Sequence, residues 1–138
     1  MRRRPLVLGA VAGALFAAAA TFATSSAGGD EVPTVEMTAR LSRFTPDRIA
    51  VERGTTVRFV LRNEDPIKHE IIIGGPEVHE RHEQGTEAYH PPIPGEATVM
   101  PYDEVATTYT FDEPGIVQFG CHLPGHWTYG MHGEIEVR

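Results

Sequence analysis

Short stretches in which apolar and polar residues alternate constrain the fold of this 138-residue chain more than any other feature. Val57, Phe59 and Leu61 alternate with Arg58 and Arg62, as in a strand with one buried face. Outside the N-terminal region, we find no apolar stripe of helical period longer than about three turns. Glycines and prolines separate the runs VEMTARL, RIAVERGTTVRFVLRNED, HEIII, TTYTF, GIVQF and GEIEVR. Several short strands with turn signals between them predict an all-β sandwich or barrel.

Residues 76–101 depart from this strand pattern. The segment PEVHERHEQGTEAYHPPIPGEATVMP is long, polar and rich in proline. Its first ten residues could form two turns of helix that begin at Pro76, and most of the rest should be loop. We therefore expect a polar flap, loop or short helix between two strands of the sandwich.

The N-terminus has the pattern of a secretory signal peptide. Three arginines precede an apolar run from Leu6 to about Ala23, and small residues at 25–27 offer a cleavage site. An uncut membrane anchor is the alternative, because the run is just long enough to span a bilayer. We expect residues 1–27 to be the signal, 28–34 a polar leader and 35–138 one domain. The protein is then exported, to the periplasm or outside the cell, with a membrane tether if the leader stays uncleaved.

Charge and cysteine content restrict the partners of the exported chain. The formal net charge of −7 becomes −10 when three arginines leave with the signal, which argues against a nucleic-acid partner. Cys121 is the only cysteine, so it cannot form a disulfide within the chain. An exported lone thiol is paired between chains, left reactive or held by a ligand, and a bound metal would protect it from oxidation.

The segment GCHLPGHWTYGM places Cys121, His126 and Met131 at C-x4-H-x4-M spacing. Thiolate, imidazole and thioether together are the ligands that favour copper. Glycines within the segment would let one loop turn twice around an ion between the strands GIVQF and GEIEVR. A copper site of this kind needs a second histidine, and His69 is the best candidate because it begins the strand HEIII after a turn.

Cys121, His126 and Met131 are also compatible with roles other than copper binding. A single cysteine is more often a small buried hydrophobic residue than a ligand, and a single methionine near a C-terminus is most often part of the core. Structural zinc sites generally use cysteine and histidine without methionine. A haem could take methionine and histidine, but the chain has no C-x-x-C-H motif. A cysteine–histidine nucleophile would need an orienting group and an oxyanion hole, which nothing in the sequence singles out.

Two blocks of the sequence resemble the cupredoxins, the blue (type 1) copper proteins that include plastocyanin, azurin and auracyanin. FTPDRIAVERGTTVRFVLRNED is similar to their early strands, and GIVQFGCHLPGHWTYGMHGEIEV to their copper loop and final strand. The similarity covers about residues 35–138. It implies a Greek-key sandwich of about eight strands and one copper ion held by His69, Cys121 and His126 in a plane, with Met131 along the axis. The implied function is one-electron transfer by a carrier rather than by an enzyme.

The chain departs from the family pattern at two places. Glu70 follows the first histidine where plastocyanin and azurin have an asparagine that ties the two ligand loops together, so we expect Asn63 or a backbone group to take that role. The loop also resembles the last domain of multicopper oxidases, which read H-C-H. His122 matches the second of those histidines but Gly120 replaces the first, so an oxidase is not expected. His122 should point away from the copper, because neighbours on a strand face opposite sides.

The resemblance also implies redox protein partners, of cytochrome or copper oxidase type, that dock near His126 on a monomer. The expected apolar rim includes Pro66, Ile67, Leu123, Pro124 and Trp127. A copper carrier or buffer for delivery or resistance is the alternative function, supported by the surplus histidines. Of these, His79 and His82 are three residues apart and would share one face if the flap is helical. With His90, Glu80 and Glu83 they could form an outer metal site, or they could simply be solvated. Nitrite reduction would need a second copper site between subunits, of which the sequence gives no sign.

Overall fold

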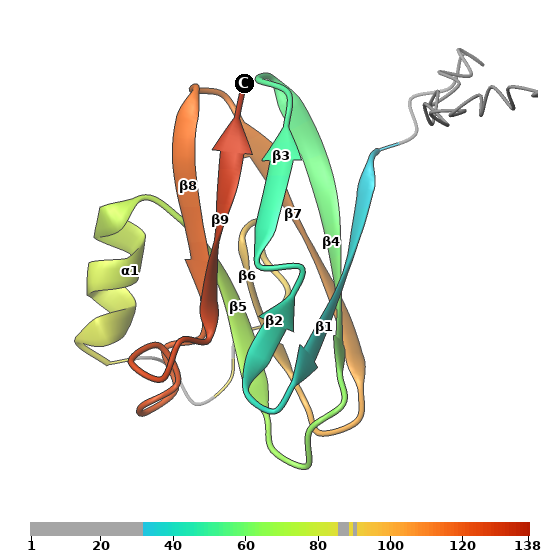
Figure 1. Ribbon diagram of the computed structural model, residues 1–138, viewed down its shortest axis with the longest axis vertical. Helices are drawn as coiled ribbons and strands as arrows, with labels where there is room; N and C mark the ends of the chain where they lie inside the picture. The colour runs from blue at the N-terminus through green and yellow to red at the C-terminus, as the bar shows by residue number, and fades with distance from the viewer. Residues whose placement is uncertain (1–31, 86–88, 90) are drawn as a thin grey trace, which may run out of the picture.

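Two β-sheets packed face to face make up the protein in this computed structural model, which describes residues 32–85, 89 and 91–138 (Figure 1). The first sheet has the strand order β2 (Arg43–Thr45), β1 (Thr34–Arg40), β4 (Thr55–Asn63) and β7 (Glu104–Phe111). The second has the order β3 (Arg48–Val51), β9 (His132–Val137), β8 (Gly115–Gly120), β5 (His69–Gly74) and β6 (Glu96–Val99). One helix, α1 (Pro76–Glu83), lies outside the sandwich against β5.

Strand β4 shows why the alternating sequence folds in this way. Val57, Phe59 and Leu61 are buried while Arg58 and Arg62 are exposed, because side chains along a strand point to opposite faces in turn. The strand pairs in parallel with β1 and antiparallel with β7. The predicted half-buried strand is confirmed, and its buried face forms one wall of the core.

Aromatic side chains fill the space between the sheets. The rings of Phe59 and Phe111 meet edge to face with centroids 6.2 Å apart, an arrangement that aromatic pairs favour. Phe44 and Phe119 pack with ring centroids 5.6 Å apart. Phe119 is fully buried and lies two residues before Cys121, so the core supports the segment that carries the predicted metal ligands.

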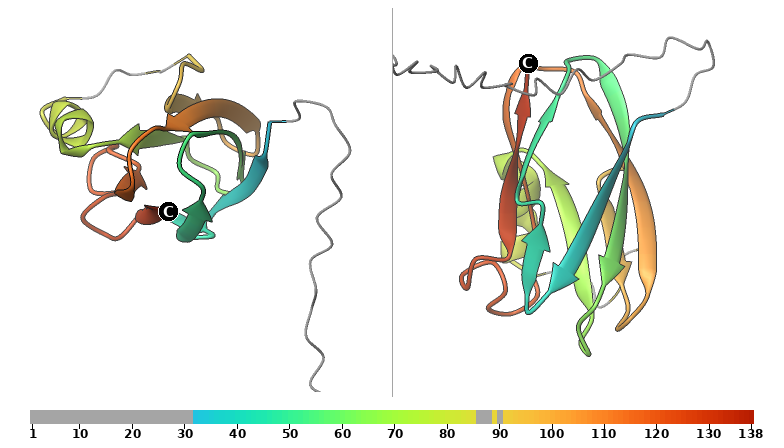
Figure 2. Two further views of the ribbon diagram at one scale, coloured as in Figure 1. Left: turned by 90° about the horizontal axis from the view of Figure 1, so that it is seen from above. Right: turned by 45° about the vertical axis from the view of Figure 1, so that its right-hand side comes forward.

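The chain changes sheet repeatedly, as a Greek-key sandwich requires. It crosses from β2 to β3, from β3 to β4, from β4 to β5, from β6 to β7 and from β7 to β8. Figure 2 shows the two layers from two further directions, with α1 on the outside. The predicted all-β sandwich is therefore confirmed.

The flap predicted over residues 76–101 is partly confirmed and partly wrong. Helix α1 begins at Pro76, as expected. Residues 96–99, however, form strand β6, which pairs antiparallel with β5, whereas the sequence favoured a loop there. Four residues carry too little alternation to be recognised as a strand, and their pairing with β5 decides their conformation. Strand β2, only three residues long, was missed for the same reason.

The predicted signal peptide and most of the leader lie outside the described residues. Cleavage at residue 27 and the domain boundary at residue 35 therefore stay predictions. Within the described ranges, no helix has both the length and the apolar character needed to cross a membrane.

Candidate metal centre

The β8–β9 hairpin places Cys121 and Met131 opposite each other. The last residue pair of the hairpin is Gly120 with His132, so Cys121 and Met131 are the next residues on either side. The Cys121 amide donates to the Met131 carbonyl at 3.0 Å, and the Met131 amide donates to the His126 carbonyl at 2.9 Å. Both Cys121 and Met131 are fully buried. Three predicted ligands are thus held in one loop by backbone hydrogen bonds.

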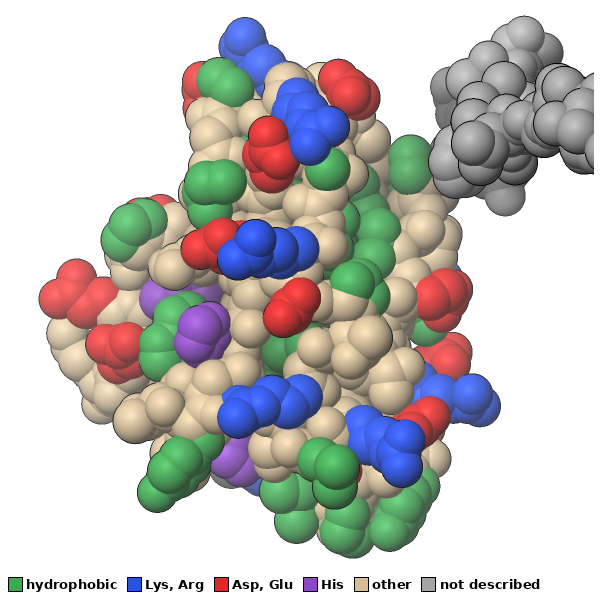
Figure 3. All heavy atoms as spheres, viewed as in Figure 1, with side chains coloured by type: hydrophobic (Ala, Val, Ile, Leu, Met, Phe, Trp, Pro, Cys, Tyr) green, Lys and Arg blue, Asp and Glu red, His purple; other side chains and the backbone are tan. Residues whose placement is uncertain are grey.

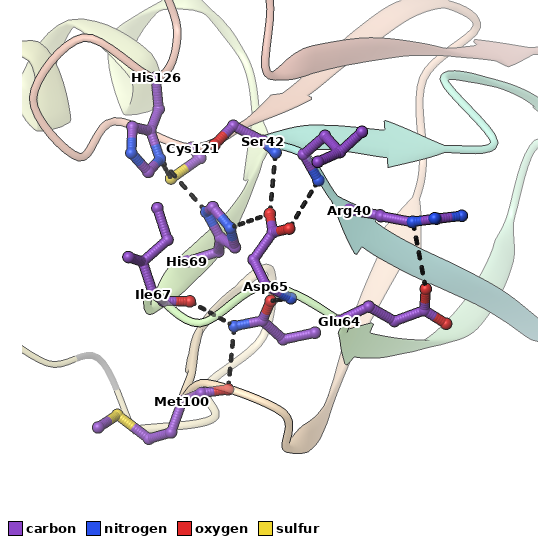
Figure 4. Close-up of polar contacts among 11 residues, drawn as sticks. Arg40, Ser42, Glu64, Asp65, Ile67, His69, Met100, Cys121 and His126 are labelled. Atoms are coloured by element: carbon purple, nitrogen blue, oxygen red, sulfur yellow. Dashed lines mark hydrogen bonds and ion pairs between the residues drawn. The ribbon is translucent and has the colours of Figure 1, made fainter.

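The fourth predicted ligand, His69, comes from the neighbouring strand. Strand β5 runs antiparallel to β8, with Ile72 opposite Gly120, so the start of β5 and the end of β8 lie at the same end of the sheet. His69 begins β5 and is fully buried. Figure 4 shows the rings of His69 and His126 directed toward the Cys121 sulfur from different segments of the chain.

The donor atoms of His69, Cys121 and His126 form one compact cluster. Nδ1 of His126 lies 3.3 Å from Nδ1 of His69 and 3.3 Å from the Cys121 sulfur. All three donor atoms lie within 4.8 Å of one another. Nitrogen and sulfur ligands about 2.0 and 2.3 Å from a shared ion lie about 3.3 to 3.5 Å apart at near-tetrahedral angles. The spacing therefore fits three ligands of a single metal ion.

Burial keeps these donors in distinct protonation states. It raises the pKa of the Cys121 thiol to about 12, so the free sulfur holds its proton near neutral pH. Burial also lowers the pKa of His69, against an opposing hydrogen bond from Asp65, and that of His126, assisted by repulsion from His69. Metal ligands must be deprotonated thiolate and neutral imidazole. The two imidazoles are therefore ready to bind, whereas the thiol must release its proton to the solvent when a metal binds.

Asp65 contacts the rear of the His69 ring, a role that the sequence did not predict. One carboxylate oxygen lies 2.8 Å from Nε2 of His69. The same carboxylate accepts the backbone amides of Leu41 at 2.6 Å and Ser42 at 2.8 Å. Burial raises the pKa of Asp65, but these amide hydrogen bonds and His69 together hold it below the ordinary value. The only sequence signal was an aspartate four residues before the candidate ligand.

Glu70 ties the His69 strand to the loop that carries Cys121, which corrects the expectation for Asn63. The Glu70 carboxylate accepts the backbone amide of His122 at 2.9 Å, and the Glu70 side chain is buried. Glu70 thus ties the two ligand-carrying segments together, the role that was expected of Asn63.

Asn63 instead organises the turn that precedes His69. Its side-chain amide donates to the carbonyls of Ile67 at 2.7 Å and Met100 at 3.0 Å, and its oxygen accepts the Asp65 amide at 2.9 Å. Asn63 therefore holds the backbone of Asp65 in place and does not reach the loop that carries Cys121.

His122 points away from the cluster, as predicted, and contacts helix α1. Its Nε2 lies 2.9 Å from Nδ1 of His79, and its ring stacks on His82 with centroids 5.8 Å apart. His79 and His82 are buried, whereas Glu80 and Glu83 are exposed. The expectation that these two histidines are solvated is therefore wrong.

Within the described ranges, the histidines of helix α1 belong to no second metal cluster. Among the described residues, only His69, Cys121 and His126 bring three ligating side chains together. His79 and His82 share one face of α1, as expected, but that face packs against the sheet, where the His79 ring also meets the Gln118 carbonyl. His90 lies outside the described residues.

Trp127 is half-buried and packs on a stack of rings, so only part of its indole is open to the expected rim. Its indole stacks on His122, with centroids 4.7 Å apart, and on His132, with centroids 4.9 Å apart. The ring lies directly over Gly120, where an added Cβ would come within 2.2 Å of it. This close approach explains glycine at the position before the cysteine.

Comparisons with known proteins agree with this geometry. The family model of the cupredoxin-like domain matches residues 12–135, which confirms the resemblance drawn from the two sequence blocks. Two curated relatives are each named copper-resistant cuproprotein CopI. The one from Rubrivivax gelatinosus is 36% identical over 100 residues, which are 70% of this chain and 60% of the relative. The one from Pseudomonas aeruginosa is 27% identical over 128 residues, which are 69% of this chain and 70% of the relative.

Solved structures show the same fold. Auracyanin B aligns with a TM-score of 0.65 at 21% identity, covering 81% of this chain and 93% of its own. Dithionite-reduced auracyanin from Roseiflexus castenholzii aligns with a TM-score of 0.63 at 21% identity, covering 80% and 99%. The thiol and two imidazoles meet in a fold that these auracyanins share. This donor set fits the predicted cofactor, copper.

Proposed function

The chain belongs to the cupredoxin-like family, and we propose that it carries single electrons through one type 1 copper centre. The proposed ligands are His69, Cys121, His126 and Met131. The observation that carries the proposal is the buried thiol of Cys121 with two imidazole nitrogens beside it. One thiolate and two imidazoles, with a weak thioether along the axis, are the ligands of blue-copper electron-transfer sites.

The protein's part in this function is to hold the ligands still. Copper bound there would supply a one-electron Cu(II)/Cu(I) couple. Backbone hydrogen bonds fix Cys121 against Met131, and the Glu70 carboxylate fixes the loop against β5. Ligands held by hydrogen bonds and a packed sandwich move little when the charge of the site changes. Little motion means little reorganisation, which favours fast electron exchange.

His126 is the proposed point of electron exit. Among the three clustered donors, His69 and Cys121 are buried and His126 is half-buried. Around this end of the molecule lie exposed apolar side chains, which we call the apolar end: Leu41, Ile67, Met100 and Tyr102. Figure 3 shows hydrophobic side chains gathered at the lower end of the molecule. Small apolar interfaces suit short-lived redox complexes, so we propose that a redox protein docks there on a monomer.

A spectroscopic titration tests the electron-transfer proposal. The mature protein, loaded with one equivalent of Cu(II), should show the intense colour of a thiolate–copper bond and should be reduced and reoxidised reversibly by one electron. Cys121→Ser should lose the colour. A colourless copper protein with an ordinary tetragonal EPR signal would refute the proposal.

Docking at the apolar end has its own test. Ile67→Lys should slow electron exchange with a small redox protein such as a cytochrome, while exchange with a small inorganic oxidant stays unchanged. Arg58→Glu, on the outer face of β4, is a control that changes charge away from this end. If the two variants slow electron exchange with the cytochrome equally, the result would count against docking at the apolar end.

A copper-handling role is the second candidate function. The names of the two relatives connect copper resistance with chains similar to this one. We propose that such a role would use the same centre, because the described residues contain only one cluster of three ligating side chains. A carrier or buffer would bind further copper or give it up readily to an acceptor. One tightly held, redox-active copper per chain favours electron transfer, and rapid loss to an acceptor protein favours copper handling.

Export remains part of the proposal. A chain with residues 1–27 removed, recovered from outside the cytoplasm and measured by intact mass, would support it. A full-length chain that stays with the membrane fraction would favour the uncut anchor.

A further inference from the structure

We propose that Asp65 is a positioning residue for the metal centre, one that sets which nitrogen of His69 binds the metal and lowers the reduction potential of the centre. This inference rests on the proposed copper-binding function and adds to it a determinant of the potential. It comes from a contact in the structure, since neither the ligand spacing nor the resemblance assigns Asp65 a role.

The geometry around His69 leaves its two ring nitrogens with different partners. Nδ1 faces Nδ1 of His126 at 3.3 Å, and Nε2 faces the Asp65 carboxylate at 2.8 Å. A carboxylate can only accept a hydrogen bond, so Nε2 carries the proton and donates it. Nδ1 is then left with a lone pair directed at the metal site. Figure 4 shows Asp65 on the side of the ring away from Cys121.

Asp65 is itself held firmly in place. Its two carboxylate oxygens accept the amides of Leu41 and Ser42, and its own amide donates to Asn63. The Asp65 residue is only 5% exposed. A carboxylate fixed by two backbone amides cannot swing away from His69 without breaking both hydrogen bonds, so the contact should persist in solution.

The backbone amides that bind the Asp65 carboxylate belong to an unusual turn. Leu41 and Ser42 both have φ of 51°, the left-handed region that non-glycine residues seldom adopt. A two-residue hairpin turn of this kind normally contains asparagine and glycine. The Asp65 carboxylate therefore has two roles, since it stabilises the turn between β1 and β2 and it orients His69. A test must separate the two.

The sign of the effect on the potential follows from the charge. A carboxylate that accepts the Nε2 proton makes the imidazole a stronger donor at Nδ1. A negative charge close to the site also stabilises the ion of higher charge more strongly. Both effects favour Cu(II) over Cu(I), so Asp65 lowers the reduction potential. Loss of such a partner typically costs 10- to 100-fold in metal affinity.

The first measurement uses the metal-free protein. ¹⁵N–¹H NMR of the His69 ring should show the proton on Nε2 and slow exchange of that proton with water. Asp65→Asn should speed this exchange. A His69 ring protonated on Nδ1 in the wild-type protein would overturn the positioning role, whether or not the site binds copper.

The second measurement is the reduction potential of the copper-loaded protein. Asp65→Asn should weaken Cu(II) binding at least tenfold more than Cu(I) binding, which raises the potential by about 59 mV for each factor of ten in that ratio. Asp103→Asn is the matched control, because it removes the same charge from an exposed turn and keeps the oxygen that accepts the Glu104 amide. A shift no larger than that of Asp103→Asn would overturn the claim about the potential.

A turn-optimised background separates the two roles of Asp65. Leu41→Asn with Ser42→Gly supplies residues that adopt the turn unaided. In this background Asp65→Asn should cost little stability against urea and should still raise the potential as much as it does alone. If the potential shift disappears together with the stability loss, Asp65 acts only through the turn and the proposal fails. If the wild-type protein binds no copper at all, the proposed function fails and the NMR result alone decides how Asp65 acts on His69.

Discussion

Glu70 should be the most sensitive link between strand β5 and the metal loop. Its carboxylate accepts the His122 amide at 2.9 Å inside the protein, where only 1% of the Glu70 surface is exposed. Glu70→Ala leaves that amide without its acceptor, which costs about 1 to 3 kcal/mol. The change also removes one buried methylene, worth about 0.8 kcal/mol. We therefore expect the free energy of unfolding to fall by about 2 to 4 kcal/mol.

Urea unfolding of the metal-free protein, followed by Trp127 fluorescence, measures this loss without the added stability that a bound metal gives. Glu70→Gln keeps an acceptor oxygen and should lose about 1 kcal/mol. Glu80→Ala, on the exposed side of α1, should change stability by no more than about 0.5 kcal/mol. The reasoning is refuted if Glu70→Ala is as mild as Glu80→Ala, or if Glu70→Gln is as damaging as Glu70→Ala.

The remaining predictions concern the loop and its ligands. Met131→Leu should keep the colour and raise the reduction potential, because a weak donor to Cu(II) is lost; a lower potential in the redox titration would contradict the axial role. The raised pKa of Cys121 means that binding releases one proton, so competition titrations should show Cu(II) affinity rising about tenfold per pH unit near neutral pH, and a flat profile would speak against thiolate ligation. Gly120→Ala drives a Cβ to within 2.2 Å of the Trp127 ring, and should cost about 1 to 3 kcal/mol in urea unfolding; unchanged stability and near-ultraviolet circular dichroism would show that the ring does not need this space.

The loop residues could be found from sequence because they lie close together in it. Cys121, His126 and Met131 fall within one short segment between two strands, so their spacing already implies a shared site. His69 lies far from them in sequence, but its place after a turn and before a strand made it recognisable. The structure brings it to Cys121 because β5 and β8 are hydrogen-bonded neighbours.

The supporting residues could not be found in this way. The amides of Leu41, Ser42 and His122, which hold the carboxylates of Asp65 and Glu70, are 23 to 52 positions away. Such contacts depend on how the turns and strands meet in space, and no local pattern of residue types carries that information. A polar residue buried through distant hydrogen bonds looks the same in sequence as a solvated one.

The histidines of helix α1 show this limit most clearly. PEVHERHE has the composition of a polar surface helix, yet His79 and His82 face inward to His122 and Trp127. Imidazole is polar enough to appear on a surface and flat enough to pack against other rings. The helical spacing correctly put the two histidines on one face, but only the structure shows what that face contacts.

The central claim is that His69, Cys121, His126 and Met131 converge on one copper ion. The most direct test is a crystal structure of the copper-loaded protein with anomalous diffraction measured on either side of the copper edge. We predict a single strong peak between the Cys121 sulfur and the Nδ1 atoms of His69 and His126. The Met131 sulfur should be the next nearest donor atom to this peak, on the axial side. A principal peak elsewhere, for example beside His79 and His122, would contradict the account.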